Sequence, residues 1–530
     1  MLQSNAVAPD QTNSADEVLI ALSPGPGALR HRLEEAIVQG IASGRLTPGT
    51  ALPPSRALAE ALGVSRWVVT EVYGHLVGTG VLDARTGSAT RVAAPLPHGA
   101  PRPAGSSRHW SGQARPAESA HRAPGPAPER AAPRARHDLA PGVPDLRHVP
   151  REAWLRAARD ALADATNEDL GGQPAAGHPA AREAVAAHLR RARVVSGPDG
   201  AVVLTRGATD GMSRIAAALA DAGHTHLLVE DPSWAPLRDV AAGAGLTPVP
   251  VPADDDGIRT DLLRTEAART GARAVLLTPA HQFPLGGVLS DDRRAAVLTW
   301  AREADGVVIE DDYDAEFRYD RRPVPALQGA DPDRVVLLGS TSKTLAPAFG
   351  IGWMVVPERW RAAVLTVSVR RGPTPGPATL DQLTLARFVA DGGYARYLRA
   401  ARTRYARRRA ALLAALDHAL PGAAVGGIAA GMHVTVDVAR VRLPGVDPEV
   451  LDAAAVVREG AARGIALVDV RRYQAAPSAR STILVVGYGN LADARLEEAV
   501  RGLRAAVEDA ARSPAAGTAP VRVPGRPGPR

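Results

Sequence analysis

One lysine stands alone in this sequence. Lys343, in the stretch GSTSKTLAPAFGIGW, is the only lysine of the chain, and the other 62 of its 63 basic residues are arginine. A lysine amine can lose its proton and form a Schiff base with a carbonyl compound, whereas an arginine guanidinium stays protonated. A GC-rich genome would account for the arginines but leaves this lysine unexplained. Lys343 is therefore the first candidate for chemistry.

Lys343 follows one of five apolar runs that end in polar residues and are typical of β-strands. The runs with their ends are AVVLTRGATDGM, HLLVEDPSW, AVLLTPAHQFPLGG, GVVIEDDYDAEF and VVLLGSTSK. They alternate with helical patterns between residues 137 and 512, which predicts an α/β domain. In open α/β sheets, ligands bind at the carboxyl ends of the strands. We therefore expect the residues that end these runs to meet at one edge of a sheet.

The residue types at these strand ends predict a phosphorylated, aromatic ligand with a carbonyl group. The turn Gly207-Ala208-Thr209 places backbone N–H groups at a helix N-terminus, which suits a phosphate. Asp311 could hold a pyridinium nitrogen and keep such a ring an electron sink, and the hydroxyl of Tyr313 could reach a ring phenolate. The indole of Trp234 could cover the ring face. Together with Lys343, these roles fit pyridoxal 5′-phosphate.

A separate helical pattern near the N-terminus predicts a DNA-binding module. Apolar residues at helical spacing between Leu29 and Ile41 predict a first helix. The tight turn Gly63-Val64 separates two further helices, and Ser65 can cap the third by accepting a backbone N–H bond. The stretch VLDARTGSATRV then predicts a small hairpin. Helix residues that point away from the apolar core are free to meet a DNA major groove.

This module is similar to the winged helix-turn-helix of GntR-type bacterial regulators. The matching motifs are LTPGTALPPSRALAEALGVSRWVV and RTGSATRV. The resemblance implies that helix-end and wing residues contact double-stranded DNA, and these are Arg56, Ser65, Arg66, Thr70 and Arg85. The module carries a weak positive field, so affinity requires two copies on paired half-sites and hence a homodimer.

The large domain resembles fold-type I aminotransferases, and more closely the MocR-type regulators, in which such a domain is fused to a GntR winged helix. The matching motifs are TPAHQFPLGGVLS, IEDDYDAEFRYDRRPVPALQG, LLGSTSKTLAPAFGIGWMVVP and AAGMHVTVDV. The resemblance implies an α/β transferase-like fold that binds pyridoxal 5′-phosphate as an aldimine of Lys343. It places Asp311 at the pyridine nitrogen, Tyr313 at the phenolic oxygen and Trp234 on the ring. It also places Ala208, Thr209, Ser340 and Ser342 near the phosphate.

Three positions depart from the family pattern. Gly350 stands seven residues after Lys343, where the family has an arginine that pairs with the cofactor phosphate. Leu170 and Gly171 stand where the family has a tyrosine that reaches the phosphate site of the neighbouring subunit. The arginine that binds a substrate carboxylate has no clear counterpart, and Arg480 is the nearest candidate, with Arg471 and Arg472 as alternatives.

Composition divides the chain into five segments and excludes several kinds of chemistry and metal site. We expect a disordered leader (1–22), a winged helix-turn-helix domain (23–93), a Pro/Arg-rich linker (94–136), an aminotransferase-like domain (137–512) and a loose tail (513–530). The chain has no cysteine, which excludes disulfides, thiol catalysis and cysteine-based zinc sites, and no metal site is predicted. It has no long apolar run and no secretory signal pattern, so we expect a cytoplasmic protein without a membrane span.

Two functions from different classes remain open. The first is a DNA-binding transcriptional regulator whose aminotransferase-like domain senses an amine, an amino acid or vitamin B6. The alternative is an active aminotransferase with a fused DNA-binding module. The departures at Gly350 and near Arg480 count against turnover, and the retained Lys343, Asp311 and Tyr313 count against a domain that has lost the cofactor.

Overall fold

The computed structural model describes residues 29–42, 45–78, 81–84, 89–93, 135–172, 174–198, 201–319, 324–370 and 376–512. The chain divides into two compact units, a smaller N-terminal one and a larger C-terminal one. The expected leader, the expected tail and the expected linker up to residue 134 lie outside the described residues. The domain boundaries drawn from the sequence therefore remain predictions.

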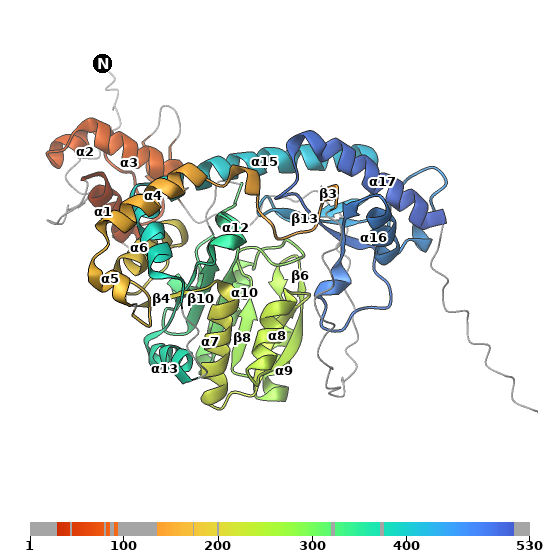
Figure 1. Ribbon diagram of the computed structural model, residues 1–530, viewed down its shortest axis with the longest axis horizontal. Helices are drawn as coiled ribbons and strands as arrows, with labels where there is room; N and C mark the ends of the chain where they lie inside the picture. The colour runs from red at the N-terminus through yellow and green to blue at the C-terminus, as the bar shows by residue number, and fades with distance from the viewer. Residues whose placement is uncertain are drawn as a thin grey trace, which may run out of the picture. The chain divides into compact units, whose positions relative to one another are not determined.

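The N-terminal unit contains three helices, which Figure 1 shows, and a short pair of antiparallel strands. Leu33 and Ile37 from the first helix and Val69 and Val72 from the third are fully buried in its core. Gly63 makes the turn between the second and third helices with a φ of +63°, in the left-handed region that glycine favours. The elements are α1 (Leu29–Ala42), α2 (Ser55–Ala61), α3 (Arg66–Gly78) and the antiparallel strands β1 (Leu82–Asp83) and β2 (Arg91–Val92).

The C-terminal unit is built on an eight-stranded sheet with the order β4-β11-β10-β9-β8-β5-β6-β7. Strands β10, β9, β8, β5 and β6 are parallel, whereas β11 is antiparallel to both its neighbours. The parallel strands bring their carboxyl ends to one edge, and this confirms the α/β architecture. The strands are β4 (Val202–Thr205), β5 (His226–Asp231), β6 (Thr247–Asp254), β7 (Gly257–Ile258), β8 (Ala274–Leu277), β9 (Val307–Asp312), β10 (Val335–Ser340) and β11 (Gly352–Val355).

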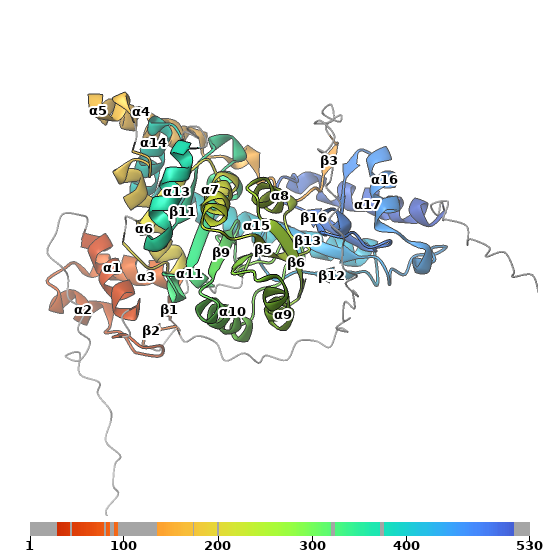
Figure 2. The ribbon, with the colours of Figure 1, turned by 90° about the horizontal axis from the view of Figure 1, so that it is seen from below.

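Helices cover both faces of this sheet, and Figure 2 shows α7, α8 and α13 on one face and α9 and α10 on the other. The middle residues of the central strands are apolar because both faces of the sheet are covered and alternate residues pack on opposite faces: Leu227 and Val229 on the α7 side, Leu228 on the α9 side. None of the described helices is long and apolar enough to cross a lipid bilayer. The helices are α7 (Ala208–Asp221), α8 (Ala235–Gly243), α9 (Thr260–Thr270), α10 (Asp291–Glu303) and α13 (Glu358–Arg370).

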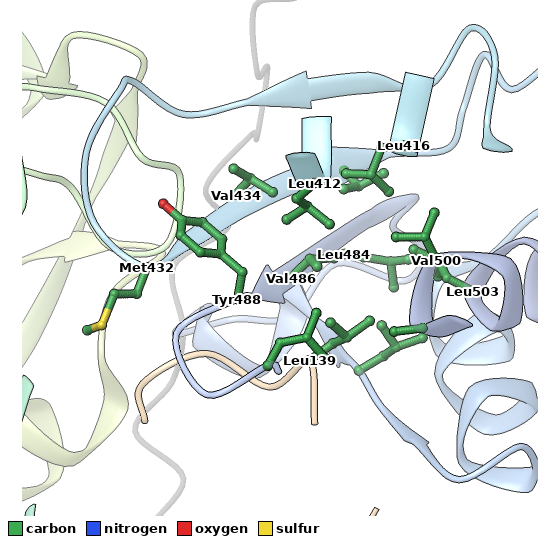
Figure 3. Packing of buried hydrophobic residues seen from close by; sticks show 14 of the residues in the cluster. Leu139, Leu412, Leu416, Met432, Val434, Leu484, Val486, Tyr488, Val500 and Leu503 are labelled. Carbon is green, nitrogen blue, oxygen red and sulfur yellow. The ribbon is translucent and has the colours of Figure 1, made fainter. Parts of the chain in front are cut away.

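A four-stranded antiparallel sheet forms the C-terminal part of the same unit. Its order is β12-β13-β16-β15, and helices α15 and α17 supply Leu412, Leu416, Val500 and Leu503 to the core that Figure 3 shows. The strands are β12 (Ala424–Gly426), β13 (His433–Asp437), β15 (Val468–Asp469) and β16 (Ile483–Gly487). The helices are α15 (Gly393–Ala419), α16 (Ala453–Ala462) and α17 (Leu496–Arg512).

The segment that follows the expected linker is fixed to this C-terminal part. Strand β3 (His137–Asp138) pairs in parallel with β14 (Ile465–Ala466), and the carbonyl of Leu139 accepts a 2.7 Å bond from the N–H of Gly487. The Arg408 guanidinium donates to the carboxylate of Asp145 at 2.7 Å, and both side chains are buried. Residues between these two anchors are therefore held at a defined place on the C-terminal part of the unit.

Candidate functional site

A pocket of about 280 Å³ lies at the carboxyl ends of β5, β9 and β10 and the N-terminus of α7. This volume is near the lower end of small-molecule clefts, which span about 300–1,000 Å³. The pocket brings together all the residues that the sequence predicts for Schiff-base chemistry and cofactor binding. They are Ala208, Thr209, Trp234, Asp311, Tyr313, Ser340, Ser342 and Lys343.

Lys343 sits in the short helix α12 (Thr341–Thr344), directly after β10. Its Nζ donates a 2.6 Å hydrogen bond to the carbonyl of Gly142 and lies 5.8 Å from the centre of the Trp234 ring. Burial lowers the pKa of Lys343, although the charge of Asp311 opposes this shift. A lowered pKa increases the neutral fraction of the amine, which is the nucleophilic form.

Gly142 makes room for this amine. Its φ of +111° lies in the region that disfavours side chains, and a Cβ at this position would stand 3.2 Å from Nζ of Lys343. The sequence contains no local signal for this contact, because Gly142 and Lys343 are 201 residues apart.

Asp311, at the end of β9, presents an unsatisfied carboxylate oxygen. Its Oδ1 is buried and has no hydrogen-bond partner among the described residues. Burial, then the neighbouring charge of Asp312, raises the pKa of Asp311 to about 7, and Lys343 opposes the rise. Asp312 itself is not available to the pocket, because Nε of Arg193 holds it at 2.7 Å. A buried, unpaired carboxylate oxygen suits a ligand that carries a positive charge or an N–H group.

The anion-binding end of the pocket is formed by the N-terminus of α7 and by the serines after β10. Gly207 has a φ of +117°, and a Cβ there would meet open space, so the turn leaves room beside the first N–H groups of the helix. Oγ of Ser340 accepts a 3.3 Å bond from the N–H of Ser342. Backbone N–H groups at a helix N-terminus and hydroxyl groups together fit a phosphate. Pyridoxal 5′-phosphate has a ring nitrogen that needs a carboxylate partner and a phosphate that needs an anion site. Asp311 and the N-terminus of α7 offer these two features in one pocket, so the residues present fit that cofactor.

Tyr313 is held by a buried histidine that the sequence did not indicate. Its hydroxyl oxygen lies 2.9 Å from Nδ1 of His281, and the same nitrogen lies 3.0 Å from both carboxylate oxygens of Asp314. The carboxylate of Asp314 accepts hydrogen bonds from this group of donors, and its negative charge and its hydrogen bond to the Tyr313 hydroxyl both favour the protonated form of that hydroxyl. Burial raises the pKa of Tyr313 well above its ordinary value, so the hydroxyl stays protonated.

Among the described residues, one cluster has metal-ligand character, although the sequence predicted no metal site. His281, Asp314 and His433 bring their ligand atoms within 4.8 Å of one another. The hydrogen bonds from His281 to Asp314 and from Nε2 of His433 to the carbonyl of Pro284 account for this arrangement without an ion. We therefore treat these residues as a hydrogen-bond network.

The expectation that Arg480 contributes to the pocket as the carboxylate-binding arginine needs correction. Arg480 does not line it, because its guanidinium donates to the backbone carbonyls of Glu449 and Leu451, the latter at 3.0 Å from Nε. Arg471 is also engaged elsewhere, with Asp452 and Asp469. Arg206, which the sequence analysis did not single out, lines the pocket. Its position directly before the Gly207 turn was the available signal.

The predicted DNA-contacting residues lie on α2 and at the start of α3. Arg56, Arg66 and Thr70 have exposed side chains, and the N–H of Val68 donates to Oγ of Ser65 at 3.4 Å, a weak version of the expected cap. The Thr70 hydroxyl donates to the carbonyl of Arg66 at 2.9 Å and is thereby occupied within the helix.

Two other features of this module bear on the expected DNA face. Arg85 lies outside the described residues. Trp67, which sequence reasoning missed, is 67% exposed on α3 beside Arg66. Trp67 directly follows Arg66, so the two exposed side chains belong to the same first turn of α3.

Comparison with family models finds the same two parts. A model described as bacterial regulatory proteins, gntR family, matches residues 29–92. A model described as aminotransferase class I and II matches residues 137–501. Among solved structures, the chain is similar to an archaeal alanine:glyoxylate aminotransferase, with a TM-score of 0.63 and 24% identity over 70% of this chain and 91% of that one. At this identity the likeness shows the fold alone.

Two curated relatives match over most of their length. The chain is 32% identical to the HTH-type pyridoxine biosynthesis transcriptional regulator PdxR of Corynebacterium glutamicum, over 79% of this chain and 85% of that protein. It is also 32% identical to the probable rhizopine catabolism regulatory protein MocR of Rhizobium meliloti, over 73% of this chain and 76% of that protein. The chain therefore belongs to the MocR-type, GntR-family transcriptional regulators, in which a winged helix-turn-helix is joined to an aminotransferase-like domain of fold type I.

Proposed function

We propose that the protein binds operator DNA and that pyridoxal 5′-phosphate, held by Lys343, makes this binding responsive to an amine, an amino acid or vitamin B6. The observation that carries the proposal is the joining, in one pocket, of a buried amine, an unpaired carboxylate oxygen and a helix N-terminus. Few ligands need all three. A regulator that acts on chromosomal DNA would work in the cytoplasm.

The chain's own residues have separate tasks in this proposal. Asp311 would face the pyridine nitrogen, Tyr313 would donate to the ring oxygen, and Trp234 would cover the ring. Ala208, Thr209, Ser340 and Ser342 would bind the phosphate. When bound, the cofactor supplies a carbon that an amine can attack and a ring that withdraws electrons. An effector amine would compete with Lys343 for that carbon.

The hydrogen bond from Lys343 to Gly142 offers a route from the pocket to the DNA-binding module. Gly142 belongs to the segment that directly follows the expected linker, and β3 and Asp145 anchor that segment on either side. A Lys343 amine bound to a ligand cannot be held at Gly142 in the same way. The ligand would therefore bind differently to two states of this segment, one with the Lys343–Gly142 bond and one without it. A ligand can shift the equilibrium between two states only if its affinities for them differ.

Sensing is favoured over turnover by the charges in the pocket. Among the described residues that line it, Arg206 is the one arginine, so a second guanidinium for the carboxylate of an amino-acid substrate is not provided there. A transaminase would need both a phosphate anchor and a carboxylate anchor. We therefore propose regulation without efficient transamination.

A homodimer is supported by exposed apolar side chains on one stretch of the C-terminal unit. Leu155 and Leu162 on α4 (Arg151–Asp164) are 63% and 55% exposed, and Leu170 on α5 (Asn167–Gly171) is 54% exposed. Large apolar side chains grouped in this way mark an interface. Two subunits would also supply the two winged helices that paired half-sites require.

The single lysine makes the cofactor proposal easy to test. The full-length protein would be mixed with pyridoxal 5′-phosphate, reduced with borohydride, digested and examined by mass spectrometry. We expect a visible absorption band before reduction and a covalent label on the Lys343 peptide, and neither in Lys343→Arg, which keeps the positive charge but cannot react. The absence of a band in the wild type, or a label confined to the N-terminal amine, would reject the proposal.

A further inference from the structure

Position 350 contributes no phosphate contact in this chain. Gly350 does not line the pocket, and its φ of +58° lies in the left-handed region, where an arginine would be strained. A Cβ built on it would meet nothing within 4 Å. The helix N-terminus and the serines therefore face the expected phosphate without a cation from this position.

Arg206 is placed to supply that missing charge. It lines the pocket and directly precedes Gly207, at the turn that leads into α7. Its backbone N–H donates to the carboxylate of Asp210, whereas its exposed guanidinium forms no hydrogen bond or ion pair with the described residues. The other basic side chain of this turn region, Arg214, is already paired with Asp210 at 2.9 Å.

We propose that Arg206 is the cationic anchor for the phosphate group of the cofactor and so makes the pocket selective for phosphorylated pyridoxal. This inference rests on the cofactor proposal above. A guanidinium can form two parallel charge-assisted bonds to a phosphate, and it would complement the N–H groups of α7 on the same anion.

One carboxylate competes for Arg206. Asp381, in the first turn of α14 (Thr379–Ala390), feels its positive charge: burial raises the pKa of Asp381 and Arg206 opposes the rise. In the part of the chain that the structure describes, the two side chains interact through their charges without forming an ion pair. Removing this carboxylate should therefore leave Arg206 more available to a phosphate.

The test compares the affinities of the full-length protein for pyridoxal 5′-phosphate and for pyridoxal, which lacks the phosphate, by absorption titration. We expect Arg206→Ala to weaken binding of pyridoxal 5′-phosphate about ten- to a hundredfold and to leave pyridoxal binding within about twofold. Arg206→Lys should fall between the two, and Asp381→Asn should not reduce the selectivity. Arg458→Ala, which removes an exposed arginine far along the chain on α16, is the matched control and should change neither affinity.

The outcomes separate this inference from the cofactor proposal. Equal losses for both ligands in Arg206→Ala, or no loss for either, would overturn the role of Arg206 while leaving Lys343 chemistry intact. A wild-type protein that binds neither form would reject the cofactor proposal, and the inference would fall with it.

Discussion

Nζ of Lys343 donates a 2.6 Å hydrogen bond to the backbone carbonyl of Gly142, across 201 residues of chain. The bond joins the single lysine of the chain, which lines the pocket, to the segment that follows the expected linker. In a two-state regulator, such a contact is of interest because a ligand that engages the amine must change it.

The contact can be tested with a pair of glycine substitutions. Gly142→Ala places a Cβ 3.2 Å from Nζ of Lys343 in a strained backbone, whereas Gly245→Ala imposes similar strain, at φ +101°, with nothing within 4 Å. Each should cost about 1–2 kcal/mol of stability, measured by thermal unfolding. Only Gly142→Ala should also alter cofactor affinity and the response of DNA binding to ligand. Equal behaviour of the two variants would argue against a role for the Lys343–Gly142 contact.

The ionised carboxylate of Asp311 should lower the free energy of unfolding of the ligand-free protein at neutral and alkaline pH. Its folded-state pKa of about 7 lies above the ordinary value near 4, so the folded protein holds the proton more tightly than the unfolded chain. The stability that this group contributes is complete below about pH 4 and is lost as the pH rises to about 7. Besides burial, the negative charges of Asp312, Asp314 and Glu230 raise the pKa of Asp311. The positive charge of Lys343 opposes this rise.

We therefore expect Asp311→Asn to stabilise the ligand-free protein at pH 8 by on the order of 1–3 kcal/mol, and by much less at pH 5. The same variant should bind pyridoxal 5′-phosphate more weakly, because it loses the charge opposite the ring nitrogen. Denaturant unfolding at both pH values measures the first effect. Asp417→Asn, at an exposed aspartate, is the control. A stability gain that is the same at pH 5 and pH 8 would contradict the assigned pKa.

His281 should act on the ligand through Tyr313. A double-mutant cycle with His281→Gln and Tyr313→Phe, read as affinity for pyridoxal 5′-phosphate, should give a coupling of about 0.5–3 kcal/mol, since the two groups are 2.9 Å apart. The pair His281→Gln and Tyr473→Phe serves as the control, because the described contacts of Tyr473 involve Trp234 and Phe283 rather than His281. Additive effects in the first cycle would show that His281 is only a packing residue.

Arg66 and Trp67, the first two residues of α3, should make contacts on which DNA binding depends. On the DNA upstream of the gene, Arg66→Ala should weaken binding about tenfold or more, in line with about 1–3 kcal/mol for a base contact. Trp67→Ala should weaken it as well. Arg30→Ala removes the same charge from an exposed position on α1 and should have a small, salt-dependent effect. Mobility-shift titrations at two salt concentrations make the comparison, and equal losses for Arg66 and Arg30 would reject the recognition role.

The exposed leucines of α4 should be part of the dimer interface. Leu155→Glu introduces a charge at a 63% exposed leucine and should shift the protein toward monomer in sedimentation experiments, with little change in thermal stability of the unit. Val450→Glu, at a valine that is 40% exposed, is the control and should leave the assembly unchanged. A Leu155→Glu protein with the mass of the wild-type assembly would exclude this surface.

The pocket residues could be predicted largely because they follow strands. Asp311, Ser340 and Lys343 come directly at or after apolar runs, and parallel strands must bring such ends to one edge of the sheet. A local pattern is therefore enough to group them. Their roles toward the cofactor remain proposals.

The partners of these residues could not be predicted, because they come from chain segments without a local signature. Gly142 reaches Lys343 through the pairing of β3 with β14, and His281 reaches Tyr313 from the loop after β8. Arg480 shows the reverse case: its place in the sequence suggested a ligand contact, but the nearby carbonyls of Glu449 and Leu451 hold its guanidinium.

By itself, the sequence determined the two kinds of domain and singled out Lys343 as the one lysine that could form a Schiff base, since helical spacing, apolar runs and a single lysine are local properties. Only the tertiary structure decided which arginine stands at the pocket, Arg206 and not Arg480, and what holds Lys343 and Tyr313. The physical reason is that a charge or a hydrogen bond acts over a few ångströms in space, and that distance is set by packing between segments far apart in the chain.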